Sequence, residues 1–234
     1  QKDVGWKKPW DRAVVLGLDV ATGKPRWSGK RGSSRIAHVT PAVARRDGRD
    51  LVVSGAGDVI QGFDAASGER LWSVFSQGEG VVPSIVLGGE LAYSCSGFED
   101  PTIRAVRLDG RGDVTKTHLV WEQKKGVPSQ ASPIFVAPHL YTVTDSGVVT
   151  CLDAADGRLV WQQRMGGSFS ASPVFADGRI YFLSEAGETT VIRPGDHYEE
   201  LAKNALGEKC QASMAVSQGQ FLIRSEHRLY CIGH

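Results

Sequence analysis

A spaced trio of Asp, Gly and Trp recurs along the chain and constrains its fold more than any other feature. The Gly follows the Asp by four residues, and the Trp follows the Gly by four. Three copies keep this spacing, and a fourth keeps only its ends around a longer loop: Asp19, Gly23 and Trp27; Asp64, Gly68 and Trp72; Asp153, Gly157 and Trp161; Asp109 and Trp121. Successive tryptophans lie 45, 49 and 40 residues apart, the period of a four-stranded propeller blade.

Each residue of the trio has a physical role in such a blade. An Asp side chain can accept hydrogen bonds from backbone N–H groups two residues on and so close a turn. Gly can take the positive φ that ends the turn. A Trp that recurs once per blade is expected to pack between neighbouring blades, because a lone sheet cannot bury both of its faces.

The remainder of each period has the composition of β-strands. Ala131–Phe135 reads Ala-Ser-Pro-Ile-Phe, and Ala171–Phe175 reads Ala-Ser-Pro-Val-Phe. Both precede a second apolar run rich in β-branched and aromatic residues. The sequence therefore predicts an all-β, single-domain β-propeller of four-stranded antiparallel blades over residues 1–234. The predicted units are a half blade (13–28), four fuller blades (36–73, 80–122, 129–162 and 169–206) and a last partial blade (211–233).

These units amount to about five blade equivalents. The half blade at 13–28 offers a surplus third strand, so we expect further blades before Gln1 and regard the chain as the C-terminal part of a larger propeller. The alternative is a complete small ring with a distorted first segment. In the blade at 169–206 the trio is lost, and residues 197–203 are expected to replace its fourth strand, although a short helix is the other reading.

Charge and composition exclude several classes of partner. The chain has 27 basic and 26 acidic residues, so it lacks the basic excess of a nucleic-acid-binding protein. No apolar run approaches the 18 or so residues that a membrane-spanning helix needs, and no membrane insertion is expected. Arg45-Arg46 reads as a solvated turn.

The four cysteines are at positions 95, 151, 210 and 231, and none are adjacent or in a Cys-x-x-Cys pair. Cys151 and Cys231 lie in apolar strand patterns and are expected to be small buried side chains. A disulfide between distant cysteines stays open.

No catalytic, cofactor or metal site is predicted from the residues. No two histidines have metal-ligand spacing, and surface histidine is the expectation except for His38, which precedes a strand expected to line the channel. The longer loop at residues 109–118 is a candidate recognition loop. Within it, Arg111-Gly112-Asp113 is interpreted as a solvated turn.

A family resemblance rests on Leu152–Trp161, which reads Leu-Asp-Ala-Ala-Asp-Gly-Arg-Leu-Val-Trp, and on the preceding Leu140–Gly147. These segments resemble the repeat of the pyrroloquinoline-quinone (PQQ)-like propellers, which include the BamB-like proteins and the quinoprotein alcohol dehydrogenases. The resemblance implies a non-enzymatic protein-interaction scaffold with a protein partner, exported to the periplasm or bacterial cell envelope.

Two other functions stay open at this point. One is a quinoprotein dehydrogenase that binds PQQ with calcium, although its adjacent pair of bonded cysteines is missing from this sequence. The other is a ligand-sensing domain of a larger receptor or kinase.

Overall fold

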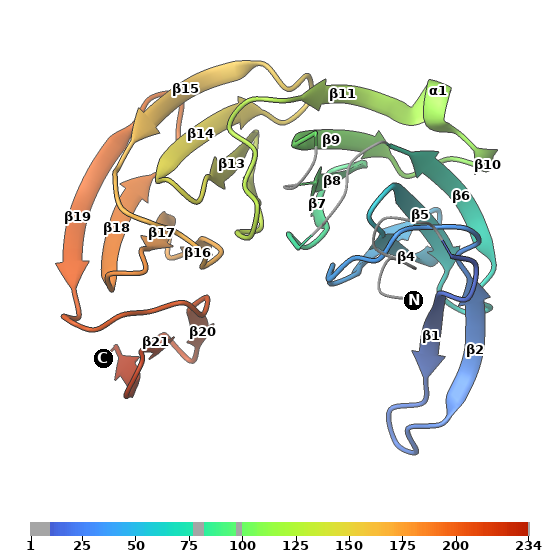
Figure 1. Cartoon of the computed structure of the whole chain (residues 1–234), viewed down its shortest axis with the longest axis horizontal. Coiled ribbons are helices and arrows are strands. Elements are labelled where there is room, and N and C mark those ends of the chain that lie inside the picture. The colour runs from blue at the N-terminus through green and yellow to red at the C-terminus, as the bar shows by residue number, and fades with distance from the viewer. Residues whose placement is uncertain (1–9, 77–81, 97–99, 234) are drawn as a thin grey trace. The chain divides into compact units, whose positions relative to one another are not determined.

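Antiparallel β-strands make up almost all of the computed structural model, which describes residues 10–76, 82–96 and 100–233 (Figure 1). The chain divides into two compact units, residues 1–124 and 125–234, and each is described by itself. Residues 80 and 81, where the predicted blade 80–122 begins, lie outside the described residues.

The first unit contains three sheets. Its strands are β1 (Val14–Leu18), β2 (Pro25–Lys30), β3 (Ala42–Arg46), β4 (Arg49–Gly55), β5 (Val59–Asp64), β6 (Arg70–Phe75), β7 (Val86–Gly88), β8 (Leu91–Ser96), β9 (Thr102–Arg107), β10 (Gly112–Asp113) and β11 (Leu119–Gln123), with one short helix, α1 (Thr115–His118). β1 and β2 pair alone, β3 to β6 pair in chain order with β10 added beside β6, and β7, β8, β9 and β11 form the third sheet.

The second unit repeats the same meander. Its strands are β12 (Ile134–Val136), β13 (His139–Val143), β14 (Val148–Asp153), β15 (Leu159–Arg164), β16 (Val174–Ala176), β17 (Arg179–Leu183), β18 (Glu188–Arg193), β19 (Glu199–Ala205), β20 (Ala215–Ser217), β21 (Gln220–Arg224) and β22 (Leu229–Ile232). They form two four-stranded sheets and one three-stranded sheet, each in chain order. The strand at β19 confirms that residues 197–203 do not begin a helix.

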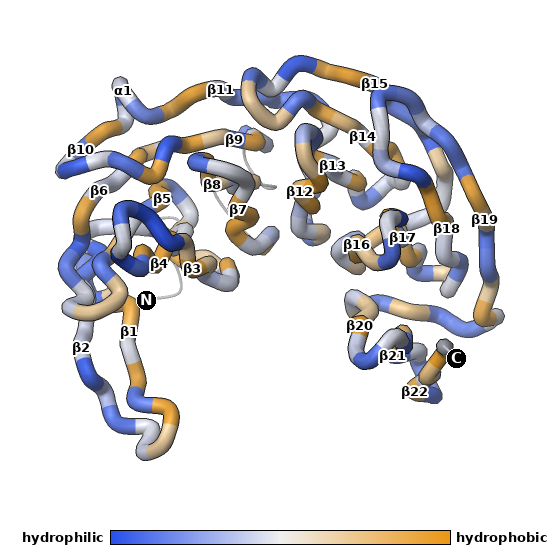
Figure 2. The backbone as a smooth tube through the Cα atoms, turned by 180° about the vertical axis from the view of Figure 1, so that it is seen from behind, coloured by the Kyte–Doolittle hydropathy of each residue, from blue (hydrophilic) through white to orange (hydrophobic). Residues whose placement is uncertain are grey.

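The core of each unit lies between neighbouring sheets. In the first unit Val53, Trp72, Val74 and Val106 are almost completely buried in one cluster, and in the second Tyr141, Val149, Phe182 and Ile192 belong to another. Figure 2 shows hydrophilic residues mainly on the turns and along the outer strands β2 and β19. Middle strands such as β5, β9 and β14 carry consecutive buried residues and are thus buried on both faces, as packed blades require.

The all-β fold with four-stranded antiparallel blades is confirmed, and the architecture is that of a β-propeller. Only α1 interrupts it within the described residues, with four residues. The prediction that residues 1–234 form a single domain stays a prediction.

Candidate functional site

The repeat aspartates close the turns between the third and fourth strands. Oδ1 of Asp19 accepts hydrogen bonds from the backbone N–H groups of Ala21 and Thr22, and Oδ1 of Asp64 accepts those of Ala66 and Ser67. Gly23, Gly68 and Gly157 follow with φ between 68° and 76°. Hydrogen bonds from Thr22 lower the pKa of Asp19, and those from Ser67 lower the pKa of Asp64, because each is made to the charged carboxylate.

Two repeat tryptophans join one sheet to the next. The indole N–H of Trp27 donates to the carbonyl of Ala65 at 2.9 Å, and that of Trp161 donates to the carbonyl of Gly195 at 2.9 Å. Both acceptors lie in the turn between the third and fourth strands of the following sheet. The indole nitrogen of Trp72 is buried and has no hydrogen-bond partner among the described residues, so the structure shows no such link after the second sheet of the first unit.

The strand register places Asp109 outside the repeat. Trp27, Trp72 and Trp161 each pair with the residue two positions before the repeat Asp: Gly17, Gly62 and Cys151. Trp121 pairs with Ala105, so Arg107 occupies the position at which the other copies have Asp. The neighbouring Leu108-Asp109 mimics the Leu-Asp of the repeat in sequence alone, because an insertion follows Arg107.

This insertion adds a strand to the edge of the preceding sheet. Gly112 and Asp113 pair in parallel with Trp72 and Ser73 of β6, and Val114 is buried in the same cluster as Trp72. The backbone N–H of Phe75 donates to Oγ1 of Thr115 at 3.0 Å. Arg111, Gly112 and Asp113 are all exposed, as expected, but their interpretation as a turn needs correction, since Gly112 and Asp113 form β10 and cover an otherwise open strand edge.

A second departure from the repeat lies beside the insertion. β3 and β4 pair over five residue pairs, whereas β7–β8, β12–β13, β16–β17 and β20–β21 each pair over three. The additional pairs are Arg45 with Asp50 and Arg46 with Arg49. The turn of this hairpin uses Asp47 and Gly48, both at positive φ. The longer hairpin thus extends four charged residues past the ends of the shorter hairpins.

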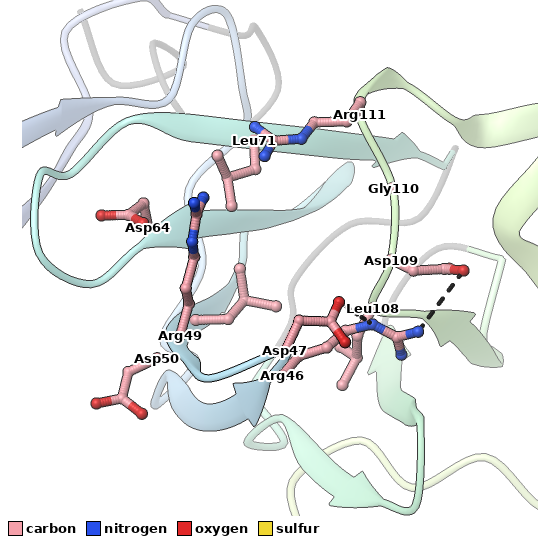
Figure 3. Close-up of a pocket in the computed structure, with 11 residues that line it drawn as sticks. Arg46, Asp47, Arg49, Asp50, Asp64, Leu71, Leu108, Asp109, Gly110 and Arg111 are labelled. Carbon is pink, nitrogen blue, oxygen red and sulfur yellow. Dashed lines mark ion pairs between the residues drawn. The ribbon is translucent and has the colours of Figure 1, made fainter.

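The long hairpin and the start of the insertion line one pocket of about 320 Å³ (Figure 3). Leucines from three strands or their ends form its apolar part, and arginines and aspartates surround them. The lining residues are Arg46, Asp47, Arg49, Asp50, Leu51, Asp64, Leu71, Leu108, Asp109, Gly110 and Arg111. The sequence predicted the contribution of loop 109–118 but missed Arg46, which is only partly exposed and is not in a simple solvated turn.

The four aspartates of the pocket already have partners in the chain. Asp109 forms ion pairs with Arg107 and Arg46, at 3.3 and 3.8 Å, and also lies 3.2 Å from Nε2 of His118. Asp47 lies 3.6 Å from Arg46, and Asp50 lies 3.2 Å from Arg45. Asp64 accepts the hydrogen bonds of its turn. The carboxylates of the pocket are therefore engaged.

Two of the three arginines of the pocket, unlike its four aspartates, have no close partner among the residues that the structure describes. Within the described part of the chain, the side chains of Arg49 and Arg111 make no hydrogen bond and no ion pair. Arg49 interacts with Asp64 only through the longer-range field that helps to lower the pKa of that carboxyl group. In Figure 3 both side chains extend toward the Leu71 side of the pocket, while Arg46 points to Asp47 and Asp109. The charged groups of the pocket that lack an ion-pair partner among the described residues are therefore the positive guanidinium groups of Arg49 and Arg111.

The histidines follow the expectation of surface residues only in part. His38 is exposed and lies before β3, in a segment that does not form a strand. His139 departs from the expectation: it is buried in β13, with Nε2 3.1 Å from Asp196. His118 is also largely buried, against Asp109. His234 lies outside the described residues, and among the described ones no group of His, Cys, Asp and Glu could hold a metal ion.

All four cysteines are free. Cys151 is buried and pairs with Trp161, at the position that Gly17 and Gly62 have opposite Trp27 and Trp72. Burial raises the pKa of its thiol to about 12. Cys231 is exposed at the free edge of β22, so the expectation that it is buried was wrong.

The second unit holds a ladder of serines that the sequence did not reveal as a contact. The backbone N–H of Ser132 donates to Oγ of Ser172, and that of Ser172 donates to Oγ of Ser213, both at 2.9 Å. The three serines occupy the same place before consecutive sheets. The repeated Ala-Ser in the sequence was the available signal.

Two solved structures are similar to this chain. The structure of a computationally designed protein, Ika8, has a TM-score of 0.70 and 12% identity, covering 97% of this chain and 66% of that one. The crystal structure of BamB from Moraxella catarrhalis has a TM-score of 0.49 and 14% identity, covering 93% of this chain and 77% of that one. The chain thus spans slightly less than two thirds of the designed protein. No curated protein sequence matches it.

The sequence profile of one family matches in two overlapping segments, residues 10–118 and 102–196. Overlapping matches are expected where a profile built on repeats meets a chain of repeats. Together they span well over half of the sequence. The chain therefore belongs to the PQQ-like repeat family described as outer membrane protein assembly factor BamB.

Proposed function

We propose that this protein is a non-enzymatic scaffold that binds a protein partner through the pocket between the β3–β4 hairpin and residues 108–111. One observation carries the proposal: the long hairpin and the insertion, two departures from the repeat in the first unit, meet at one pocket. Repeats are kept by packing between blades, whereas insertions in repeat proteins gather on the face that binds.

The composition of the pocket supports protein binding. Leu51 and Leu108 are buried and Leu71 partly so, and charged side chains surround them. An apolar centre with a charged rim, in which arginine is prominent, is typical of protein–protein contact sites. Family membership favours the same role, and with it a place in the bacterial cell envelope and an exported protein. No helix among the described residues is long and apolar enough to cross a membrane.

The proposal is tested by narrowing the pocket without removing an arginine. Asp50 stands on the rim with about half of its side chain exposed, so Asp50→Trp would obstruct the opening at little cost to folding. Gln163→Trp on the exposed outer strand β15 of the second unit is the matched control.

Tagged wild type and both variants are purified from cells that make the protein naturally, and co-purified proteins are quantified. We expect one protein in near-stoichiometric amount with wild type and Gln163→Trp, reduced at least tenfold with Asp50→Trp. Equal recovery with all three, or no such protein with wild type, would overturn the proposal.

A further inference from the structure

We infer that the pocket recognises an acidic side chain next to an apolar one on its partner, with Arg49 and Arg111 binding the carboxylate. This inference rests on the proposed function and names the chemistry that the partner must present. It follows from which charges of the pocket the chain itself satisfies.

The aspartates of the pocket have intramolecular partners, as described above. The charge of Arg46 is also balanced, because its guanidinium lies 3.5 to 3.8 Å from three carboxylates: Asp47, Glu90 and Asp109. Its Nε is buried and makes no hydrogen bond within the described residues. Among the arginines of the pocket, Arg49 and Arg111 have no ion pair with any described residue. A carboxylate is the planar acceptor that best matches a guanidinium group, and two such groups can bind one carboxylate from both sides.

The apolar part of the pocket sets the second requirement. Leu71 is partly exposed and lies on the same side of the pocket as the two arginines in Figure 3, whereas Leu51 and Leu108 are buried in the wall of the pocket. A free carboxylate ion would leave the exposed part of Leu71 in contact with water, whereas an apolar side chain beside the carboxylate would cover it. The volume of about 320 Å³ accommodates a few side chains rather than a folded element.

Replacing Arg by Lys at positions 49 and 111 distinguishes hydrogen bonding by planar guanidinium groups from a purely electrostatic attraction. Lys keeps the positive charge but not the planar pair of donors. Arg49→Lys and Arg111→Lys should therefore bind more weakly than wild type but better than the glutamine variants. A purely electrostatic attraction would treat Lys as equal to Arg.

Binding is measured with labelled Gly/Ser decapeptides that carry a central Leu-Glu, Leu-Gln or Ser-Glu pair, and with succinate as a free dicarboxylate. Nitrogen-15 spectra of the arginine side chains follow the titrations, with Arg49→Gln and Arg111→Gln used both for assignment and as tests. Arg26→Gln is the control, because Arg26 is exposed in the same unit and paired with Asp19.

We expect the Leu-Glu peptide to shift the Arg49 and Arg111 signals saturably, with at least tenfold weaker binding of the other two peptides and of succinate. Each glutamine variant should weaken Leu-Glu binding at least fivefold, and Arg26→Gln should not. Equal binding of Leu-Glu and Leu-Gln, or of Leu-Glu and succinate, would overturn the inference. Loss of the partner with Asp50→Trp but not with Arg49→Gln or Arg111→Gln would also overturn it, while the proposed function stands.

Discussion

Trp161 donates its indole N–H to the carbonyl of Gly195 at 2.9 Å, and the backbone N–H of the same Gly195 donates to the hydroxyl of Tyr141 at 2.9 Å. Gly195 in the β18–β19 turn is thus held by the preceding sheet through both its N–H and its C=O. The sheet that contains β18 and β19 lacks the repeat Asp and Trp, yet the link to the preceding sheet is kept. The position of a backbone carbonyl, rather than the identity of the turn residues, therefore maintains the contact between blades.

The contribution of this bond is separable from packing with an isosteric analogue. Replacing Trp161 by benzothienylalanine, in which sulfur takes the place of the N–H, should lower the free energy of unfolding by about 1 kcal/mol. The same replacement at Trp72 should leave stability unchanged or raise it, because no described residue accepts a hydrogen bond from that buried indole N–H. Urea unfolding of both variants measures the difference. A loss at position 72 as large as that at position 161 would contradict the assignment.

The turn at Asp64 should stabilise the fold in a pH-dependent way. Its pKa is lower in the folded protein than in the unfolded chain, so the carboxylate stabilises the fold above its unfolded pKa. That stabilisation is lost as the pH falls through the folded value. Asp64→Ala should therefore cost roughly 1 kcal/mol or less at neutral pH and progressively less below about pH 4.

Thermal unfolding of wild type and Asp64→Ala between pH 3 and pH 7 measures this effect. Glu69→Gln is the control in the same turn, because the Glu69 side chain makes no hydrogen bond or ion pair within the described residues. A stability difference for Asp64→Ala that stays constant over this range would show that the charge of the turn does not matter.

The serine ladder predicts a local change in amide exchange. Ser172→Ala removes the acceptor of the Ser132 N–H but leaves the bond from its own N–H to Ser213. Hydrogen exchange at residue 132 should rise by about tenfold, which corresponds to the roughly 1.4 kcal/mol of one decade, while residue 172 stays protected. Ser213→Ala should expose residue 172 instead. Equal exchange at both residues in both variants would rule out a directional ladder.

Thiol reactivity should separate one cysteine from the other three. Burial raises the pKa of Cys95, Cys151 and Cys210, whereas Cys231 is exposed. Because the thiolate is the reactive form, iodoacetamide should label only Cys231 in the native protein and all four after denaturation. Mass spectrometry of the digested protein reads out the labelled positions. Native labelling of Cys151 would contradict its place opposite Trp161.

The sequence was sufficient for the blade pattern because its turn chemistry is local. Asp64, Gly68 and Trp72 act within nine consecutive residues, so their spacing alone carries the information. Asp109 shows the limit of this reasoning. It follows a Leu, as the Asp of the repeat does in other copies, but the strand pairing places Arg107 at the position of the repeat Asp. Strand register depends on pairing between strands, which an insertion can shift without leaving a trace in the repeat spacing.

Of the two segments that form the candidate site, only the insertion could be predicted from the sequence. The insertion at 109–118 interrupts a period and is visible as extra length. The long β3–β4 hairpin is not visible in this way, because its two additional pairs fall inside an ordinary interval between tryptophans. Arg46, Arg49 and Asp50 thus had no sequence signal that set them apart from other charged turn residues.

The account depends most on the claim that a protein partner occupies the pocket of the first unit. Photo-crosslinking tests it directly, with p-benzoylphenylalanine placed at position 50 on the pocket rim or at position 163 on β15, in cells that make the protein naturally. The account predicts one discrete adduct with another protein from position 50 and none from position 163. No adduct from position 50, or the same adduct from both positions, would contradict it.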